Sequence, residues 1–190
     1  MRLGIFGGSF DPPHVGHLLV VTDAYEALGL DRLIFVPAAV QPLKAGQASA
    51  KARDRLEMVK LLVADDARFS VDPIEIEREG LSYTVETLAA FAERHPEAER
   101  FFLVGTDVLA AFGQWREPER VLRLATLAVM QRAGEAGPVP PGAVRVETRR
   151  VDVSSTEIRE RVRTGRTIRG FVPEPVAAYI EAQRLYRLED

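Results

Sequence analysis

The chain has 190 residues, of which 46% are hydrophobic and 28% charged, a composition typical of a soluble globular protein with one sizeable core. It has no cysteine, which excludes disulfides, thiolate metal sites and cysteine nucleophiles, and a net charge of -3 argues against a large nucleic-acid surface. Its apolar runs are far shorter than the roughly 18 residues that span a bilayer, and a strand pattern rather than a secretion signal follows Met1, so we expect a cytoplasmic protein.

Strand-like and helix-like segments alternate along the chain. Short apolar runs predict strands at 3–6, 33–36, 69–76, 101–104, 126–130, 144–146 and 151–153. Apolar residues three or four apart predict helices at 16–28, 52–64, 84–94, 107–112, 117–124, 156–163 and 174–185, with Thr84 as an N-cap. This alternation predicts an α/β fold, a doubly wound parallel sheet with helices on both faces, forming one domain over 1–190 with a small C-terminal helical extension.

Three segments with glycine or polar residues follow predicted strands, at 7–11, 105–107 and 154–156. The carboxyl ends of parallel strands meet at one edge of a sheet, and doubly wound folds bind their ligands there. We therefore expect the three segments to converge on one crevice.

The first of these segments belongs to the stretch GGSFDPPHVGH, residues 7–17, which contains two of the three histidines. Gly7 and Gly8 allow the backbone to approach a ligand, and the helix that follows offers free N–H groups at its positive end, which together favour an anion. His14 and His17 lie three positions apart on one side of the first helical turn, so both can donate to one phosphate. Gly16 leaves room for a bound nucleotide.

Two other interpretations of this stretch stay open at this point. In the first interpretation, His14 and His17 are ordinary surface histidines with a capping role. In the second, Asp11 joins them as the third ligand of a hydrolytic zinc site, although the positive end of a helix disfavours a cation.

The stretch GSFDPPHVGH resembles the signature of the nucleotidyltransferases with the HxGH motif, and in particular of the bacterial nicotinate mononucleotide adenylyltransferases. The resemblance covers essentially the full chain and implies a Rossmann-like fold. It implies that His14 and His17 hold the phosphates of ATP and stabilise the transition state. Gly7, Gly8, Ser9 and Phe10 are then also part of the ATP site.

The stretch SSTEIR, at 154–159, resembles the second phosphate motif of that family, SxTxxR. On its residues alone it is a helix start with hydroxyl caps, which is a common feature. The resemblance implies that Ser154, Ser155, Thr156 and Arg159 contact ATP, with the β- and γ-phosphates as the groups held.

Gly105 and Asp107 resemble the G-x-D stretch that lies against the nucleotides in that family, although Asp107 alone reads equally as a helix cap. The family also implies that Trp115 stacks on the pyridine ring and that backbone amides near Tyr83 and Thr84 receive the nicotinate carboxylate. On composition alone, a single tryptophan is more often part of a core.

Two further cationic residues belong to the predicted substrate site. Arg116 adds charge complementarity to an acid substrate, or else is a solvated surface residue. The chain has Gln41-Pro42-Leu43-Lys44 where the family usually has Pro-Pro-His-Lys, so Lys44 can still reach a phosphate while a contact of the missing histidine is lost. Ser9 and Lys44 are assigned to nicotinate mononucleotide as well.

The resemblance implies adenylyl transfer from ATP to nicotinate mononucleotide, which yields deamido-NAD and pyrophosphate in NAD biosynthesis. The attacking phosphate is already ionised, so positioning and charge stabilisation carry catalysis, with His14, His17, Lys44 and Arg159 as catalytic residues. Mg²⁺ is expected to accompany ATP, and no nucleic-acid or membrane partner is expected. The alternatives are nicotinamide mononucleotide or phosphopantetheine as acceptor, a non-catalytic nucleotide sensor, or a metal hydrolase. The sequence leaves the oligomeric state open, a homo-oligomer included.

Overall fold

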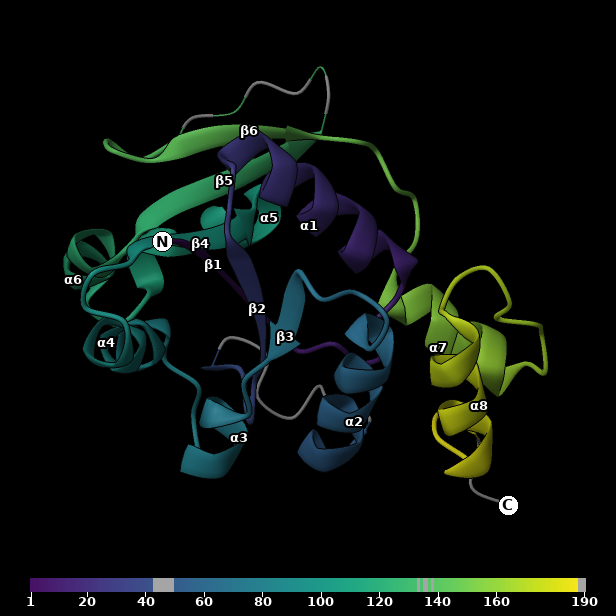
Figure 1. Ribbon diagram of the computed structural model, residues 1–190. Coiled ribbons are helices and arrows are strands. Elements are labelled where there is room, and N and C mark those ends of the chain that lie inside the picture. The colour runs from purple at the N-terminus through teal and green to yellow at the C-terminus, as the bar shows by residue number, and fades with distance from the viewer. Residues whose placement is uncertain (43–49, 133, 135–136, 138, 188–190) are drawn as a thin grey trace.

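A computed structural model describes residues 1–42, 50–132, 134, 137 and 139–187. Within these residues, six strands form one sheet and helices cover both of its faces (Figure 1). The strands are β1 (Arg2–Gly8), β2 (Arg32–Pro37), β3 (Phe69–Val71), β4 (Glu99–Gly105), β5 (Thr126–Arg132) and β6 (Val144–Thr148). The helices are α1 (Val15–Leu28), α2 (Ala52–Val63), α3 (Ile74–Arg78), α4 (Thr84–Arg94), α5 (Thr106–Leu109), α6 (Pro118–Leu124), α7 (Ser155–Arg163) and α8 (Glu174–Ala182), with a short 3-10 helix, η2 (Phe112–Gln114).

The described strands are all parallel, in the order β3-β2-β1-β4-β5-β6. Strand β1 lies near the middle, where Ile5 pairs with Ile34 of β2 on one side and with Phe102 of β4 on the other. The chain first builds outward from β1 to β3 and then returns to place β4 beside β1. The carboxyl ends of β1 and β4 therefore form the switch point at which such sheets bind ligands. The predicted doubly wound α/β fold is confirmed.

Side chains alternate between the two faces of the sheet and fill two apolar clusters. Phe6 and Phe35 enter the cluster under α1, α2, α7 and α8, whereas Ile5 and Ile34 enter the cluster under α4 and α6, where Phe91 is fully buried. Figure 1 shows α4 and α6 side by side at one end of the molecule and α7 and α8 together at the other. Burying one side chain of this size stabilises the fold by roughly 1.5–3 kcal/mol, so both clusters hold β1 and β4 firmly.

Two predicted strands are wrong. The strand predicted at 69–76 ends at Val71, and α3 begins at Ile74, because Pro73 cannot donate to a ladder and the Asp72 carboxylate accepts the Ile74 N–H at 3.0 Å. The segment 151–153, also predicted as a strand, is neither strand nor helix.

The helix predictions differ from the structure mainly at the ends. The N-cap of α4 is Tyr83, and the predicted cap Thr84 is the first helical residue. The helix predicted at 107–112 is split into α5 and η2, and α8 ends at Ala182. In the described part of the chain, no helix is long and apolar enough to cross a membrane.

Candidate active site

A cleft of about 770 Å³ opens at the carboxyl ends of β1 and β4. Its volume lies within the range of small-molecule sites. The three segments expected to converge do so here, because residues of 7–11, of 105–107 and of 154–156 all line this cleft. The predicted site residues found in its walls are Gly7, Gly8, Ser9, Phe10, His14, His17, Tyr83, Thr84, Gly105, Asp107, Trp115, Arg116, Ser154, Ser155, Thr156 and Arg159. Lys44 lies outside the described residues.

The two histidines of the opening stretch lie face to face. Their ring centroids are 3.8 Å apart, and the backbone N–H of His14, the N-cap of α1, donates to Nδ1 of His17 at 3.1 Å. Because Nδ1 of His17 accepts, the neutral ring carries its proton on Nε2, which remains a donor. Capping is therefore present, through the His17 side chain, but His14 is buried and is not an ordinary surface histidine.

The environment of both imidazoles favours their neutral form. Burial lowers the pKa of His14 to about 4. Burial also lowers the pKa of His17 well below its ordinary value, and the charge that His14 would carry lowers it further. Near pH 7 both rings are thus neutral and can donate an N–H without adding a positive charge to the cleft.

The glycines near the histidines make room for side chains of the chain itself. A Cβ at Gly16 would lie 2.9 Å from Nδ1 of His14, and a Cβ at Gly8 would lie 2.9 Å from the Phe10 ring. Gly16 was expected to make room for a nucleotide. In the structure the His14 ring covers Gly16, so the missing side chain makes room for His14. Phe10 adopts φ 50, a strained value for a large residue, and its buried ring contacts the edge of His17 at a centroid distance of 5.1 Å.

The stretch SSTEIR, at 154–159, is joined directly to the loop before α1. Ser154 is the N-cap of α7, and its hydroxyl accepts the backbone N–H of Glu157 at 3.1 Å, so the predicted cap is confirmed. Ser155 donates to the carbonyl oxygen of Pro12 at 2.8 Å. Arg159 donates to the carbonyl oxygen of Asp11 at 2.7 Å. The N-terminus of α7 is therefore docked onto the loop that precedes α1.

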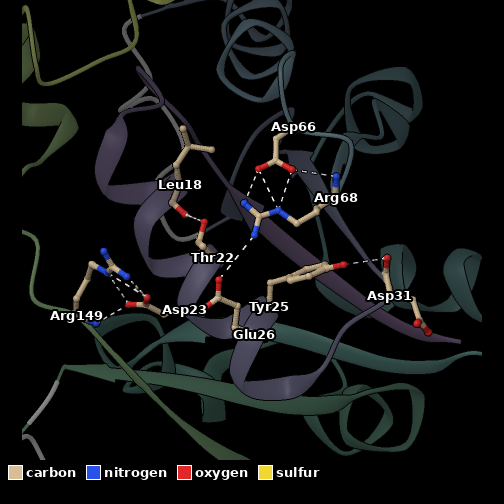
Figure 2. A network of polar contacts seen from close by, with 9 residues as sticks. All are labelled: Leu18, Thr22, Asp23, Tyr25, Glu26, Asp31, Asp66, Arg68 and Arg149. Atoms are coloured by element: carbon tan, nitrogen blue, oxygen red, sulfur yellow. Dashed lines mark hydrogen bonds and ion pairs between the residues drawn. The ribbon is translucent and has the colours of Figure 1, made fainter.

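The segment between β6 and α7 is also held to α1. Figure 2 shows Asp23 of α1 facing Arg149, whose backbone N–H and guanidinium donate to the carboxylate at 2.6 to 3.0 Å. These hydrogen bonds from Arg149 lower the pKa of Asp23. The same view shows Arg68, next to β3, paired with Asp66 and approaching Glu26 of α1. Helix α1 is thus fixed on its outer side at two points.

A further part of the cleft wall, the aromatic end, is lined by Tyr83 and Trp115. Trp115 is half-buried, with its ring against Phe102 at a centroid distance of 6.1 Å. The guanidinium of Arg116 lies 4.7 Å above the Tyr83 ring and pairs with Glu86 at 2.7 Å. Because the Arg116 side chain is 51% exposed and already paired, its charge is only partly available to a substrate.

Sequence reasoning missed two buried charged residues of the cleft walls. Arg55 is 2% exposed and donates to the carbonyl oxygens of Ser9, Ala39 and Ala50, so it joins the loops that follow β1 and β2. The sequence feature that could have revealed the burial of Arg55 is a basic residue on the apolar face of α2. Glu75 accepts the Thr87 hydroxyl at 2.6 Å, and burial raises its pKa.

The structure does not support the zinc interpretation of the opening stretch. In the part of the chain that the structure describes, histidine and carboxylate side chains form no group of three or more that could hold a metal ion. Oδ1 of Asp11 instead accepts the Ala50 N–H at 3.1 Å and the Tyr186 hydroxyl at 2.8 Å.

Comparison with known proteins agrees with this geometry. The Cytidylyltransferase-like family matches residues 5–161. The chain is 51% identical over 197 residues to a protein of Gemmatimonas aurantiaca named probable nicotinate-nucleotide adenylyltransferase, covering 98% of this chain and 93% of that protein. It is 46% identical to a protein of the same name from Thermus thermophilus, covering 98% and 100%. A solved structure, Plasmodium falciparum nicotinic acid mononucleotide adenylyltransferase complexed with NaAD, has a TM-score of 0.79 at 18% identity, covers 97% of each chain and shows the shared fold.

Proposed function

Because the chain belongs to the cytidylyltransferase-like family, and within it to the nicotinate-nucleotide adenylyltransferases, we propose that it transfers the adenylyl group of ATP to nicotinate mononucleotide. The products are nicotinate adenine dinucleotide and pyrophosphate, and the reaction is a step of NAD biosynthesis. The observation that supports this best is the meeting of two phosphate motifs in one cleft, where Arg159 donates to the carbonyl oxygen of Asp11 in the loop before His14.

The chemistry needs no general base, because the phosphate of the mononucleotide is already an anion. It attacks the α-phosphorus of ATP, and the bond from that phosphorus to the pyrophosphate oxygen breaks. In the proposal, His14 and His17 donate N–H groups to the phosphoryl oxygens on which charge develops, and Arg159 and the N-terminus of α7 hold the leaving pyrophosphate. Lys44 supplies a further cation. Gly105 and Asp107 lie against the adenylyl half.

The acceptor is assigned to the aromatic end of the cleft. Trp115 stacks on the pyridine ring, and the first amides of α4, at Tyr83 and Thr84, receive its carboxylate. Ser9 donates its hydroxyl to Gln41 at 2.8 Å and its carbonyl oxygen accepts Arg55, so its backbone N–H is the group proposed to contact the acceptor phosphate. Arg116 contributes little to this recognition because it is paired with Glu86.

Magnesium enters the proposal as part of the ATP substrate. The cleft is lined by the carboxylates of Asp11, Glu75 and Asp107, but among the described residues they belong to no group of three or more ligands that could hold a metal ion, so they provide no cage for Mg²⁺. The ion is expected to be coordinated by phosphate oxygens and water, and no step is assigned to it.

A pyrophosphate-release assay tests the function. ATP is supplied with nicotinate mononucleotide, nicotinamide mononucleotide or phosphopantetheine, and we expect the highest kcat/KM with the first. A higher value with either of the others would assign the acceptor differently. Binding of ATP without pyrophosphate release in the presence of any acceptor would identify a nucleotide sensor. Zinc found in the purified protein by elemental analysis would favour the metal hydrolase. The variant His17→Ala, prepared in parallel, controls for contaminating enzymes.

Three further parts of the prediction belong to this proposal. They are a single catalytic domain over residues 1–190, a cytoplasmic location and the absence of nucleic-acid partners. Gel filtration coupled to light scattering determines the oligomeric state, which the sequence leaves open.

A further inference from the structure

The end of the described chain returns to the candidate active site. After α8, residues Arg184 and Tyr186 adopt φ 51 and 62, values that residues other than glycine rarely take and that surrounding contacts must hold. The ring of Tyr186 packs against the apolar cluster under α1 and α2. Its hydroxyl donates to Oδ1 of Asp11, a residue 175 positions earlier in the chain, at 2.8 Å.

Asp11 is the point at which three parts of the molecule meet. It is 5% exposed and lies in the loop between β1 and α1. Its carboxylate accepts the N–H of Ala50, which precedes α2, as well as the Tyr186 hydroxyl. Its carbonyl oxygen accepts Nη1 of Arg159. A shift of Asp11 would therefore move the guanidinium that the proposed function places on the pyrophosphate.

The hydroxyl of Tyr186 is suited to this contact. Burial and the neighbouring charge of Asp11 raise its pKa, so it stays protonated and donates throughout the working pH range. The nearby guanidinium of Arg55 donates to the carbonyl oxygens of Ser9, Ala39 and Ala50, so it also ties the loop of Asp11 to the segments after β2 and before α2.

We propose that Tyr186 is a positioning residue for catalysis, which fixes Asp11 and through it aligns Arg159 with the triphosphate of ATP. The proposal rests on the proposed function for the identity of the ligand. It assigns to the C-terminal segment a role in the reaction that reaches beyond stabilising the fold.

A second tyrosine provides a matched control. Tyr179 of α8 donates its hydroxyl to Asp54 of α2 at 3.0 Å, so it also joins the C-terminal part to the body of the protein through an aspartate. Neither Tyr179 nor Asp54 lines the cleft. The variants Tyr186→Phe and Tyr179→Phe therefore remove the same group and the same kind of hydrogen bond, and only the first disturbs Asp11.

The two variants are compared by steady-state kinetics, thermal unfolding and calorimetric titration with ATP. We expect Tyr186→Phe to lower kcat/KM for ATP by about tenfold, the scale of one hydrogen bond to a charged group, with KM for nicotinate mononucleotide unchanged. Tyr179→Phe should change kcat/KM for ATP less than twofold. Its Tm should fall by about as much as the Tm of Tyr186→Phe. Equal kinetics in the two variants would overturn the positioning role.

A double-mutant cycle with Asp11→Ala, which removes the acceptor of the Tyr186 hydroxyl, locates the effect. If Tyr186 acts through Asp11, the double variant loses no more than Asp11→Ala alone, whereas losses that multiply would contradict the proposal. The outcomes also separate the two claims. A wild-type chain that releases no pyrophosphate refutes the proposed function. The titration with ATP tests the positioning role separately. A weaker ATP affinity in Tyr186→Phe, but not in Tyr179→Phe, supports that role, and equal affinities refute it.

Discussion

The two ends of the cleft are built in different ways. At the end where the proposed function places the phosphates, the phosphate end, the imidazoles of His14 and His17 are stacked and held neutral by burial, and the loop around them is hydrogen-bonded to α7 through Ser155 and Arg159. At the end where the proposed function places the acceptor ring, the pyridine end, Trp115 is half-buried, and the side chains of Arg116 and Glu86 are exposed to solvent and paired with each other.

This difference separates two tasks. Groups that stabilise a transition state must be ordered before the reaction, because reorganising them would add to the barrier. Groups that recognise a substrate ring need only a complementary surface, and an exposed ring can supply it. We therefore expect changes at the phosphate end to lower kcat and changes at the pyridine end to raise KM for the acceptor.

The largest effect is expected from His17→Ala. The change removes one preorganised donor, so kcat should fall by ~10² or more while the far-ultraviolet circular dichroism stays unchanged. His95→Ala is the control, because the third histidine ends α4 and does not line the cleft. Near-normal turnover in His17→Ala would place the chemistry elsewhere.

The buried state of His14 predicts a dependence of stability on pH. The pKa of His14 is about 4 in the folded chain and 6.5 ordinarily. Between these two pH values the unfolded chain binds a proton at His14 and the folded chain does not, so stability falls as the pH decreases from 6.5 toward 4. The free energy of unfolding should drop by ~2 kcal/mol between about pH 8 and about pH 5 for this reason alone.

Chemical denaturation of the wild type and of His14→Gln measures this contribution. The variant lacks the imidazole, so the difference in unfolding free energy between the two proteins should change by that amount across the pH range. A constant difference would mean that His14 is not held neutral by burial, and the contrast between the two ends would weaken.

A smaller effect is expected from Trp115→Ala. Loss of a stacking surface worth ~1–3 kcal/mol should raise KM for nicotinate mononucleotide about tenfold and leave KM for ATP unchanged. Trp115→Phe keeps a ring face and should recover most of the loss. If Trp115→Ala lowered kcat and left KM for the acceptor unchanged, the proposed division between the two ends would be wrong.

The smallest effect is expected from Arg116→Ala. The guanidinium is exposed and paired with Glu86, so its removal should raise KM for nicotinate mononucleotide less than threefold, in keeping with the roughly 0–1 kcal/mol of an exposed pair. A rise of more than tenfold, measured against Glu86→Gln as a control, would show that this cation meets the substrate carboxylate.

The local features of the molecule followed from neighbouring residues. The helix start at Ser154 was predicted because the hydroxyl of a cap bonds an N–H only three positions later. The error at 69–76 was local as well. Asp72 and Pro73 are a turn signal, and the apolar residues around them masked it.

The amino-acid sequence alone determined the alternation of strands and helices, the sheet class and the segments that meet at its carboxyl edge, because periodicity and glycine placement act over a few residues. Only the tertiary structure decided that Arg55 is buried among carbonyl oxygens, that the rings of His14 and His17 stack and lose their charge, and that Asp11 is bonded to residues near the other end of the chain. Burial and contacts between distant segments depend on how whole layers pack, and this information is spread over the entire chain.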